Sequence, residues 1–318
     1  MKFAAIDLGT STFKLLIMEQ KEPSINQNPL QIIAQHIETV KLGAKGINQN
    51  TIAQPAFRRG VAAMKKLASI CNSHELKPSQ IAAVATSAVR SAKNGADFVA
   101  KVHQKTNINV EIIDGNREAE LIYIGVKNAF KMSKKPALII DIGGGSVEFI
   151  IANSQQIFWK ESVEIGMDRF IDWFEMSDPI ANAQQIQIVE HIKQQTQSVE
   201  HQIKHYNVKR LVGAANSFET LAEIAAQNLG QIEAYRSQTH FDTSPWAMKK
   251  VIHALLQTTT VQRQLMPQIP AARLRAIVPA CLLVGYFVGL VGSKQPITTT
   301  RFALKEGVCF EGIRLFQV

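Results

Sequence analysis

Cysteine is scarce in this chain of 318 residues, and its placement restricts where the protein can work. The three cysteines, Cys71, Cys281 and Cys309, are far apart and odd in number. They form neither a disulfide framework nor a zinc-binding pattern, which fits a reducing compartment. The N-terminus reaches Asp7 before any apolar stretch is long enough to act as a signal peptide. We therefore expect a cytoplasmic protein.

Clusters of basic and aromatic residues are also missing, although the chain is basic overall. The formal net charge is +9, yet no run of Lys and Arg forms a tail, and 7% of the residues are aromatic. Nucleic-acid-binding surfaces usually concentrate basic residues on one face or in a recognisable motif, so we expect no nucleic-acid partner. The positive charge remains suited to an anionic small molecule or polymer. The oligomeric state is left open, a homodimer included.

Long uncharged stretches are rare as well. One segment, residues 276–293, lacks charge over a length that approaches a bilayer span. It includes IVPACLLVGYFVGLVG and contains one proline and three glycines, Pro279, Gly285, Gly289 and Gly292. We predict a buried core helix there rather than a membrane span, and we expect no membrane partner.

The sequence does contain an internal repeat. The segment AIDLGTSTFKLLI begins at Ala5 and IIDIGGGSVEFII begins at Ile139, so the two align without a gap at an offset of 134 residues. Each copy is an apolar strand, an Asp-x-Gly turn of small residues and a second apolar strand, which is the pattern of a β-hairpin. The copies match at three chemically important positions: Asp7 with Asp141, Gly9 with Gly143, and Thr12 with Ser146.

Similar predicted elements follow both copies. After the first copy, strands are predicted at 30–40, 81–85 and 110–114, and helices at 51–72 and from 116; after the second, strands at 157–163 and 210–214, a long helical region at 167–206, and a helix from 217. The shared order of strands and helices predicts two α/β domains with mixed sheets. We place them at residues 1–130 and 131–300, joined by the segment KMSKKP. Whether a C-terminal helix at about 301–318 packs back on the first domain is left open.

The two hairpin turns carry the residue types of a phosphate-binding site. Glycine lets the backbone approach a ligand closely, and the N–H groups of a tight turn can converge on phosphate oxygens. Serine and threonine add hydroxyl donors. The turn residues that we expect to bind phosphate are Thr10, Ser11, Thr12, Gly143, Gly144, Gly145 and Ser146.

Acidic residues beside these turns indicate a cation. Asp141 ends the first strand of the second hairpin, and Glu148 lies in its second strand. A carboxylate at such a position is a poor anion ligand, but it can hold Mg²⁺ or Mn²⁺, which would offset phosphate charge. Asp7 is the equivalent of Asp141 in the first copy. We predict Asp141, Glu148 and Asp7 as metal ligands, with solvated strand positions as the alternative.

Five segments together resemble the exopolyphosphatase/guanosine pentaphosphate phosphohydrolase (Ppx/GppA) family. They are AAIDLGTSTFKL at Ala4, ATSAVRSAKNG at Ala85, IIDGNREAELIYIGV at Ile112, LIIDIGGGSVEFI at Leu138 and ESVEIGMDRF at Glu161. They follow the order of the family and extend over most of the chain. The resemblance implies the fold of the acetate and sugar kinase/Hsp70/actin superfamily. This is an α/β fold of two ribonuclease H-like (actin-like ATPase) domains with mixed sheets and an interdomain cleft.

The resemblance also implies a hydrolase that releases terminal phosphate from inorganic polyphosphate or guanosine pentaphosphate. It places the proposed catalytic glutamate of the family at Glu118, which would accept a proton from the attacking water. It also favours Arg90 and Lys14 as phosphate ligands, and the guanidinium fork of arginine suits phosphate. From the residues alone, Glu118 could instead complement its helix dipole, and the two basic residues could lie on solvated surfaces.

Several positions depart from the usual family pattern. Ser11 stands where Asn is usual, Lys14 where Arg is common and Val147 where Thr is usual. The turn GAANSF, which starts at Gly213, lacks two glycines of the similar turn in the family. Two alternative functions stay open: a phosphotransferase of the same superfamily, and a polyphosphate or nucleotide sensor with little turnover. The presence of Glu118 in its motif favours water as the acceptor.

Overall fold

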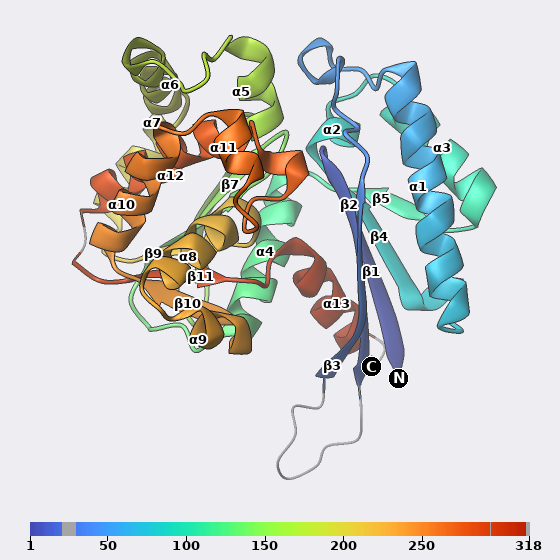
Figure 1. Ribbon diagram of the computed structural model, residues 1–318. Coiled ribbons are helices and arrows are strands. Elements are labelled where there is room, and N and C mark those ends of the chain that lie inside the picture. The colour runs from blue at the N-terminus through green and yellow to red at the C-terminus, as the bar shows by residue number, and fades with distance from the viewer. Residues whose placement is uncertain (21–29, 293, 316–318) are drawn as a thin grey trace. The chain divides into compact units, whose positions relative to one another are not determined.

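The computed structural model describes residues 1–20, 30–292 and 294–315, which form two compact units. Unit 1 comprises Met1–Gly125 and the C-terminal segment from Leu304, and unit 2 comprises Val126–Ala303. Helix α13 (Leu304–Leu315) therefore belongs with the N-terminal sheet (Figure 1). Residue 293 of the predicted apolar segment and residues 316–318 of the predicted C-terminal helix lie outside the described residues.

Unit 1 is built on a mixed five-stranded sheet with the order β3-β2-β1-β4-β5. Strands β1, β2 and β3 pair antiparallel, whereas β1, β4 and β5 pair parallel. The chain reverses at the first Asp-x-Gly turn, between β1 and β2, as the hairpin pattern predicts. The strands are Lys2–Leu8 (β1), Thr12–Gln20 (β2), Leu30–Thr39 (β3), Ile81–Ala85 (β4) and Val110–Ile112 (β5).

The two faces of this sheet pack against different helices, because successive side chains of a strand alternate between faces. Ile6 points into a core that also contains the buried ring of Phe98. Phe3, on the other face, lies against Gly312 of α13, and Asp7 shares the Phe3 face. The other helices of the unit are α1 (Gln54–Ser73), α2 (Ser87–Arg90), α3 (Gly95–Thr106) and the first part of α4 (Gly115–Ala129), with short 3₁₀ helices at Ile47–Gln49 and Pro78–Gln80. The last residues of α4, from Val126, belong to unit 2.

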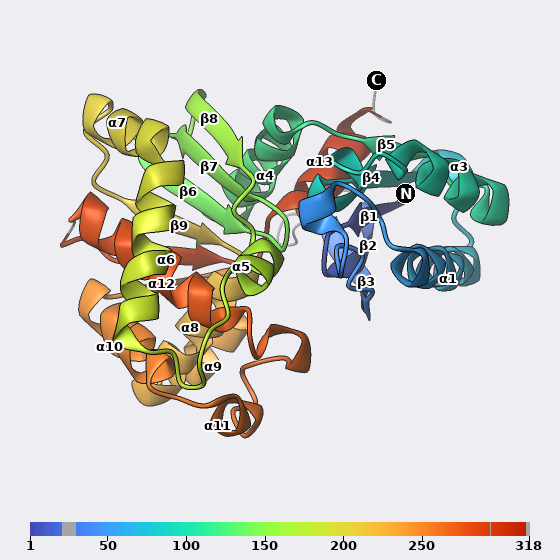
Figure 2. The ribbon, with the colours of Figure 1, turned by 90° about the horizontal axis from the view of Figure 1, so that it is seen from above.

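Unit 2 contains a mixed six-stranded sheet with the order β10-β11-β9-β6-β7-β8. Its strands are Ala137–Ile142 (β6), Val147–Ala152 (β7), Ile157–Val163 (β8), Leu211–Ala214 (β9), His240–Thr243 (β10) and Ile297–Thr300 (β11). Its helices are α5 (Met167–Trp173), α6 (Asn182–Gln195), α7 (Gln197–His205), α8 (Asn216–Asn228), α9 (Ile232–Ser237), α10 (Pro245–Leu256), α11 (Thr260–Gln264) and α12 (Ile277–Val291), with a 3₁₀ helix at Ala271–Arg273. The long helical region predicted at 167–206 is therefore divided into three helices (Figure 2).

The two sheets repeat one topology, in agreement with the sequence repeat. The order β3-β2-β1-β4-β5 of unit 1 corresponds to β8-β7-β6-β9-β11 of unit 2, and each pair of neighbours has the same direction in both. Strand β10 extends the second sheet by pairing antiparallel with β11. The sequence analysis does not predict β10 and β11, because each has four residues and β11 reads ITTT, which lacks an apolar alternation.

Helix α12 confirms the predicted buried core helix. It packs among α5, α6, α8 and α10, and the ring of Phe287 lies against Phe149 of β7 with centroids 4.9 Å apart. Burying one apolar side of a sheet under a helix that is apolar all round is a common way to complete an α/β core. Across residues 1–20, 30–292 and 294–315, no helix combines the length and the apolar character that a membrane crossing requires.

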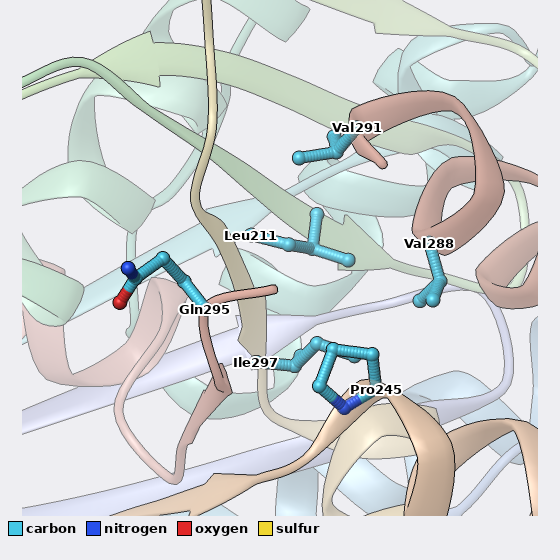
Figure 3. Close-up of a pocket in the computed structure, with 6 residues that line it drawn as sticks. All are labelled: Leu211, Pro245, Val288, Val291, Gln295 and Ile297. Carbon is cyan, nitrogen blue, oxygen red and sulfur yellow. The ribbon is translucent and has the colours of Figure 1, made fainter. Parts of the chain in front are cut away.

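A small pocket lies at one end of the unit 2 sheet (Figure 3). Its volume is about 210 Å³, part of it open to solvent, and it is lined by Leu211, Pro245, Val288, Val291, Gln295 and Ile297. Leu211 begins β9, whereas Asp141 of β6 pairs with Ala214 at the far end of that strand. The pocket is therefore at the end of the unit 2 sheet away from Asp141 and Glu148.

Asp178, in the segment before α6, forms hydrogen bonds with the start of α11. Because of this contact, we expect the stability of unit 2 to depend on pH. Its carboxylate oxygens accept the N–H of Thr260 at 2.8 Å, and Arg263 Nη2 lies 3.0 Å from Oδ1. These bonds lower the pKa of Asp178, and the hydrogen bond from the backbone N–H of Thr260 has the largest effect. A carboxyl group whose pKa is lower in the folded state stabilises the fold above its unfolded pKa, and this contribution is lost as the pH falls through the folded pKa.

We expect Asp178→Asn to lower the free energy of unfolding at neutral pH by at most about 1 kcal/mol, because the group is half exposed. The difference from the wild type should shrink as the pH falls below the ordinary aspartate range. All three tryptophans lie in unit 2, so urea unfolding followed by tryptophan fluorescence measures the relevant transition. The exposed Asp172→Asn is the control, and an identical pH profile for both variants would count against the Asp178 contact.

Candidate functional site

The two hairpin turns have the same internal geometry. Gly9 N donates to Thr12 O at 3.2 Å, and Gly143 N donates to Ser146 O at 3.0 Å. A Cβ atom added to either glycine would lie 2.9 Å from that same carbonyl oxygen, which real side chains almost never approach so closely. Glycine is therefore required at both positions by the tightness of the turn, and the sequence repeat is reproduced at the level of single hydrogen bonds.

In both turns, carbonyl groups accept hydrogen bonds from the segment that follows the third strand of the unit, β3 in unit 1 and β8 in unit 2. In the second turn, Gly143 O, Gly144 O and Gly145 O accept from Met167 N, Asp168 N and Gly166 N at 3.0, 2.8 and 3.1 Å. In the first turn, Thr10 O accepts from Gly43 N at 3.2 Å, and Ser11 O accepts from Val40 N and Lys41 N at 3.0 and 2.8 Å. In a trans peptide the C=O and the following N–H point in opposite directions. The N–H groups that follow these carbonyls therefore point to the opposite side of each turn, and on that side they can bind phosphate oxygens. They belong to Ser11, Thr12, Gly144, Gly145 and Ser146.

The hydroxyl groups of the turns differ in exposure. Thr10 and Ser146 are 4% and 3% exposed, whereas Ser11 and Thr12 are half-buried. Of the predicted phosphate-binding hydroxyls, those of Ser11 and Thr12 are thus the more accessible to a ligand. The backbone of the second turn is also accessible at Gly143 and Gly144, which are half-buried.

Asp7 lies at the end of β1, directly opposite Lys14 of β2 in the antiparallel register. Burial raises the pKa of Asp7, while the positive charges of Lys14 and of Lys305 in α13 act in the opposite direction. Lys305 forms a salt bridge with its neighbour Glu306, which is also close enough to influence Asp7. Sequence reasoning did not identify Lys305 and Glu306, because they reach Asp7 from the other end of the chain.

Asp141 and Glu148 are paired opposite each other on β6 and β7, so both side chains are on one face of the sheet. They are 6% and 2% exposed. Glu148 Oε1 accepts from Ser162 Oγ at 2.8 Å, and Asp141 Oδ1 accepts from Asn216 Nδ2 at 3.2 Å. Two buried carboxylates side by side repel each other unless a cation or a proton lies nearby.

This donor set fits Mg²⁺, which typically takes one or two protein carboxylates and completes its octahedral shell with water and substrate phosphates. It does not resemble a closed structural metal site. In the described part of the chain, no group of three or more His, Cys, Asp or Glu side chains is placed to hold a metal ion. Two carboxylates would need water and phosphate oxygens as the remaining ligands of such an ion.

The GAANSF turn keeps a glycine-like backbone although it has alanine and asparagine. Ala215 has φ 48° and ψ −165°, and Asn216 has φ 48°. Such positive φ values are unfavourable for residues with a Cβ, so other contacts must hold the turn. Arg273 supplies them, since its Nη1 and Nη2 donate to Asn216 O and Oδ1 at 2.9 and 3.0 Å. Burial lowers the pKa of Arg273, and Glu219 and Asp141 oppose that effect.

Arg273 is thus a further residue near the candidate site that the sequence analysis did not identify. It is 57 residues from Asn216 in sequence, and the segment AARLRA around it carries no pattern that distinguishes a site residue from a surface arginine. Asn216 of the GAANSF turn is hydrogen-bonded both to Arg273 and to Asp141, so the turn is connected to one of the predicted metal ligands.

Glu118 is a buried ion-paired residue rather than a helix cap. It lies in the first turn of α4 and is 6% exposed. Its Oε2 lies 2.7 Å from Nη1 of Arg90, which also donates to Ile113 O at 3.3 Å. The cap is provided by Asp114, whose Oδ1 accepts the N–H of Arg117 at 2.7 Å. The structure therefore brings together Glu118 and Arg90, two of the predicted site residues.

The neighbouring acid Glu120 has a different setting. Its side chain is 41% exposed and pairs with Arg117 at 3.4 Å, one turn of the same helix away. An exposed pair of this kind contributes little to stability. The two glutamates at the start of α4 thus differ in burial, which makes Glu120 a useful control for Glu118.

The sequence profile of the Ppx/GppA phosphatase family matches residues 16–315 of this chain. The bifunctional 3-dehydroquinate synthase/phosphatase of Fusobacterium nucleatum is 31% identical to it over 240 residues. The match covers 74% of this chain and 35% of that protein, so the chain corresponds to about a third of the length of this relative.

Two solved structures share the fold of the whole chain. An exopolyphosphatase from Cytophaga hutchinsonii is 33% identical with a TM-score of 0.92, and 99% of this chain and 98% of that chain are covered. The Ppx/GppA family member from Aquifex aeolicus is 20% identical with a TM-score of 0.80, covering 100% and 99% of the two chains. These likenesses and the two mixed sheets confirm the predicted α/β class, and the fold is that of the Ppx/GppA structures.

Proposed function

This chain belongs to the Ppx/GppA phosphatase family, and we propose that it is a phosphoanhydride hydrolase that releases terminal phosphate from inorganic polyphosphate or guanosine pentaphosphate. The observation that carries this proposal is the setting of Glu118. A carboxylate that is 6% exposed, paired with Arg90 and not used to cap its helix is costly for the fold. Catalysis is a reason to keep it, since a hydrolase needs a base that is held in place.

In the proposed reaction, Glu118 accepts a proton from the attacking water. An ion pair with Arg90 Nη1 at 2.7 Å fixes the orientation of the Glu118 carboxylate, so Arg90 holds the base in place. Arg90 was expected to contact substrate, and we propose that it also restrains Glu118. Placing water and phosphate in line supplies much of the rate enhancement in phosphoryl transfer.

The turns bind the phosphate oxygens in this proposal. Because hydrogen bonds hold the turn carbonyls in place, the backbone N–H groups are already oriented. They need no rearrangement as negative charge develops on the phosphate oxygens. Lys14, opposite Asp7, adds a positive charge beside the first turn. The net charge of +9 favours the approach of a polyanion.

A bound Mg²⁺ or Mn²⁺ would neutralise charge on the phosphate oxygens. Asp141 and Glu148 would hold it, and Asp7 is a further proposed ligand. The two buried carboxylates support this role, because they lie opposite each other on adjacent strands and on one face of the sheet, where a divalent cation would offset their mutual repulsion.

The proposal is tested by measuring phosphate release from polyphosphate and from guanosine pentaphosphate with Mg²⁺ present. We expect release from at least one of them without any acceptor other than water. Consumption of ATP that depends on an added acceptor would instead identify a phosphotransferase. Tight binding of either polyanion without phosphate release would identify a sensor.

We expect Glu148→Gln to raise the Mg²⁺ concentration for half-maximal activity by at least about tenfold. The change is nearly isosteric and keeps an oxygen that can accept from Ser162, so the melting temperature should change little. Glu161→Gln is the matched control. Glu161 lies on strand β8 of the same sheet, and its carboxylate also accepts a hydrogen bond from a serine hydroxyl, that of Ser198. A Mg²⁺ titration decides the point, and equal titration curves for the wild type and Glu148→Gln would exclude the metal role.

A further inference from the structure

The segment Glu164–Arg169, between β8 and the first turn of α5, is packed directly on the second glycine turn. The N–H groups of Gly166, Met167 and Asp168 donate to the three glycine carbonyls of that turn. A Cβ added to Gly166 would lie 2.3 Å from the carbonyl carbon and oxygen of Gly144. The segment therefore touches the turn backbone with no space between them.

Arg169 adds a side-chain bond to the same contact. Its side chain is 7% exposed, and its Nε donates to Gly145 O at 2.8 Å. Gly145 O also accepts Gly166 N at 3.1 Å, so both lone pairs of this carbonyl are used. The guanidinium group forms a salt bridge with Glu164, whose side chain is 43% exposed.

We infer that Arg169 is a positioning residue for phosphate binding, a role that rests on the function proposed above. Three consecutive glycines have unusual backbone freedom, so their peptide planes need an external constraint. Arg169 fixes the Gly145 carbonyl, and because the peptide is planar this also fixes the N–H of Ser146 on the opposite side. Arg169 lies on the carbonyl side of the turn, so it acts through the turn and not by touching the phosphate.

All residues of this contact outside the turn lie in the segment ESVEIGMDRF, one of the five segments that resemble the family. Glu164 holds the arginine from the solvent side, Gly166 permits the close approach, and Arg169 makes the bond. The segment thus works as a support for the phosphate-binding turn.

The test compares Arg169→Gln with Arg263→Gln. Arg263 is also buried in unit 2 and makes similar bonds, to Leu274 O at 2.8 Å and to Asp178 Oδ1 at 3.0 Å. Both substitutions remove a buried guanidinium, but only Arg169 contacts the turn. Glu164 stays hydrated after the change because it is nearly half exposed, which favours folding of the Arg169→Gln protein.

Two measurements are made on each full-length variant. Calorimetric titration with tripolyphosphate and Mg²⁺ should show affinity weakened about tenfold or more for Arg169→Gln and unchanged for Arg263→Gln. Amide hydrogen exchange should become faster at residues 166–168 in Arg169→Gln alone, because those N–H groups donate to the turn. Equal affinity and equal exchange in Arg169→Gln and the wild type would overturn the inference.

The design separates this inference from the proposed function. If the wild type binds neither tripolyphosphate nor guanosine pentaphosphate, the proposed function fails, and the exchange measurement still decides whether Arg169 orders the turn. If Arg169→Gln does not fold, Arg169→Lys replaces it, since lysine keeps the charge but lacks the guanidinium fork. Wild-type affinity and exchange in that variant would equally overturn the inference.

Discussion

Replacing Glu118 by Gln is expected to lower kcat by about 10²–10⁴-fold, the usual contribution of a general base. This corresponds to roughly 3–5 kcal/mol of activation free energy. Glutamine keeps the size of the side chain and an oxygen that can accept from Arg90, but it cannot take a proton from water. Substrate should therefore still bind, and kcat should fall much more than KM changes. Steady-state kinetics on polyphosphate and guanosine pentaphosphate measures both quantities.

The control for this experiment is Glu120→Gln. Glu120 lies two residues further along the same helix, its side chain is 41% exposed, and it forms an ion pair with Arg117. We expect this variant to retain near-normal kcat and to lose at most about 1 kcal/mol of stability. Thermal unfolding of both proteins shows whether lost activity reflects lost folding. Full turnover in Glu118→Gln, or an equal loss in both variants, would refute the role of Glu118.

Gly307→Ala is expected to destabilise unit 1 by about 3 kcal/mol, near the upper end of overpacking effects. An added Cβ would lie 1.8 Å from the carbonyl oxygen of Leu121 and 3.2 Å from the N atom of Gly125. Both atoms belong to the backbone of α4, so α13 and α4 would have to separate. Because Leu121 follows Glu118 by less than one turn, kcat should fall as well. Calorimetry measures the stability, since the tryptophans report on unit 2.

Gly289→Ala is the matched control for that substitution. Gly289 also lies within a helix, α12, but an added Cβ there meets no atom within 4 Å. Alanine is favoured over glycine within a helix, so this variant should gain up to about 1 kcal/mol. Opposite signs for the two glycines are the expected result. A stable Gly307→Ala protein would show that the two helices can shift without cost.

Much of the fold could be predicted because the decisive signals are local. The Asp-x-Gly turns and their apolar flanks are contiguous in sequence, and the copies at Gly9 and Gly143 align without a gap. Helix α12 could be predicted from one uncharged stretch. Strands β10 and β11 could not, because four residues that pair only with distant strands carry little local pattern.

The contacts within the candidate site were mostly out of reach of the sequence. The family motif indicated Glu118 and Arg90, but their ion pair joins residues 28 positions apart and depends on how α4 packs. Lys305 reaches Asp7 from the C-terminal helix, and Arg273 reaches the GAANSF turn from a 3₁₀ helix. Tertiary packing determines which of these distant residues meet, and the local pattern of a single sequence does not reveal it.

The most direct test of the central claim is hydrolysis of polyphosphate or guanosine pentaphosphate in water enriched with ¹⁸O, followed by mass analysis of the released phosphate. Attack by water that Glu118 activates predicts one ¹⁸O atom in each phosphate released by the wild type, and far slower release by Glu118→Gln. Phosphate without ¹⁸O, or release that depends on an added acceptor, would contradict the account.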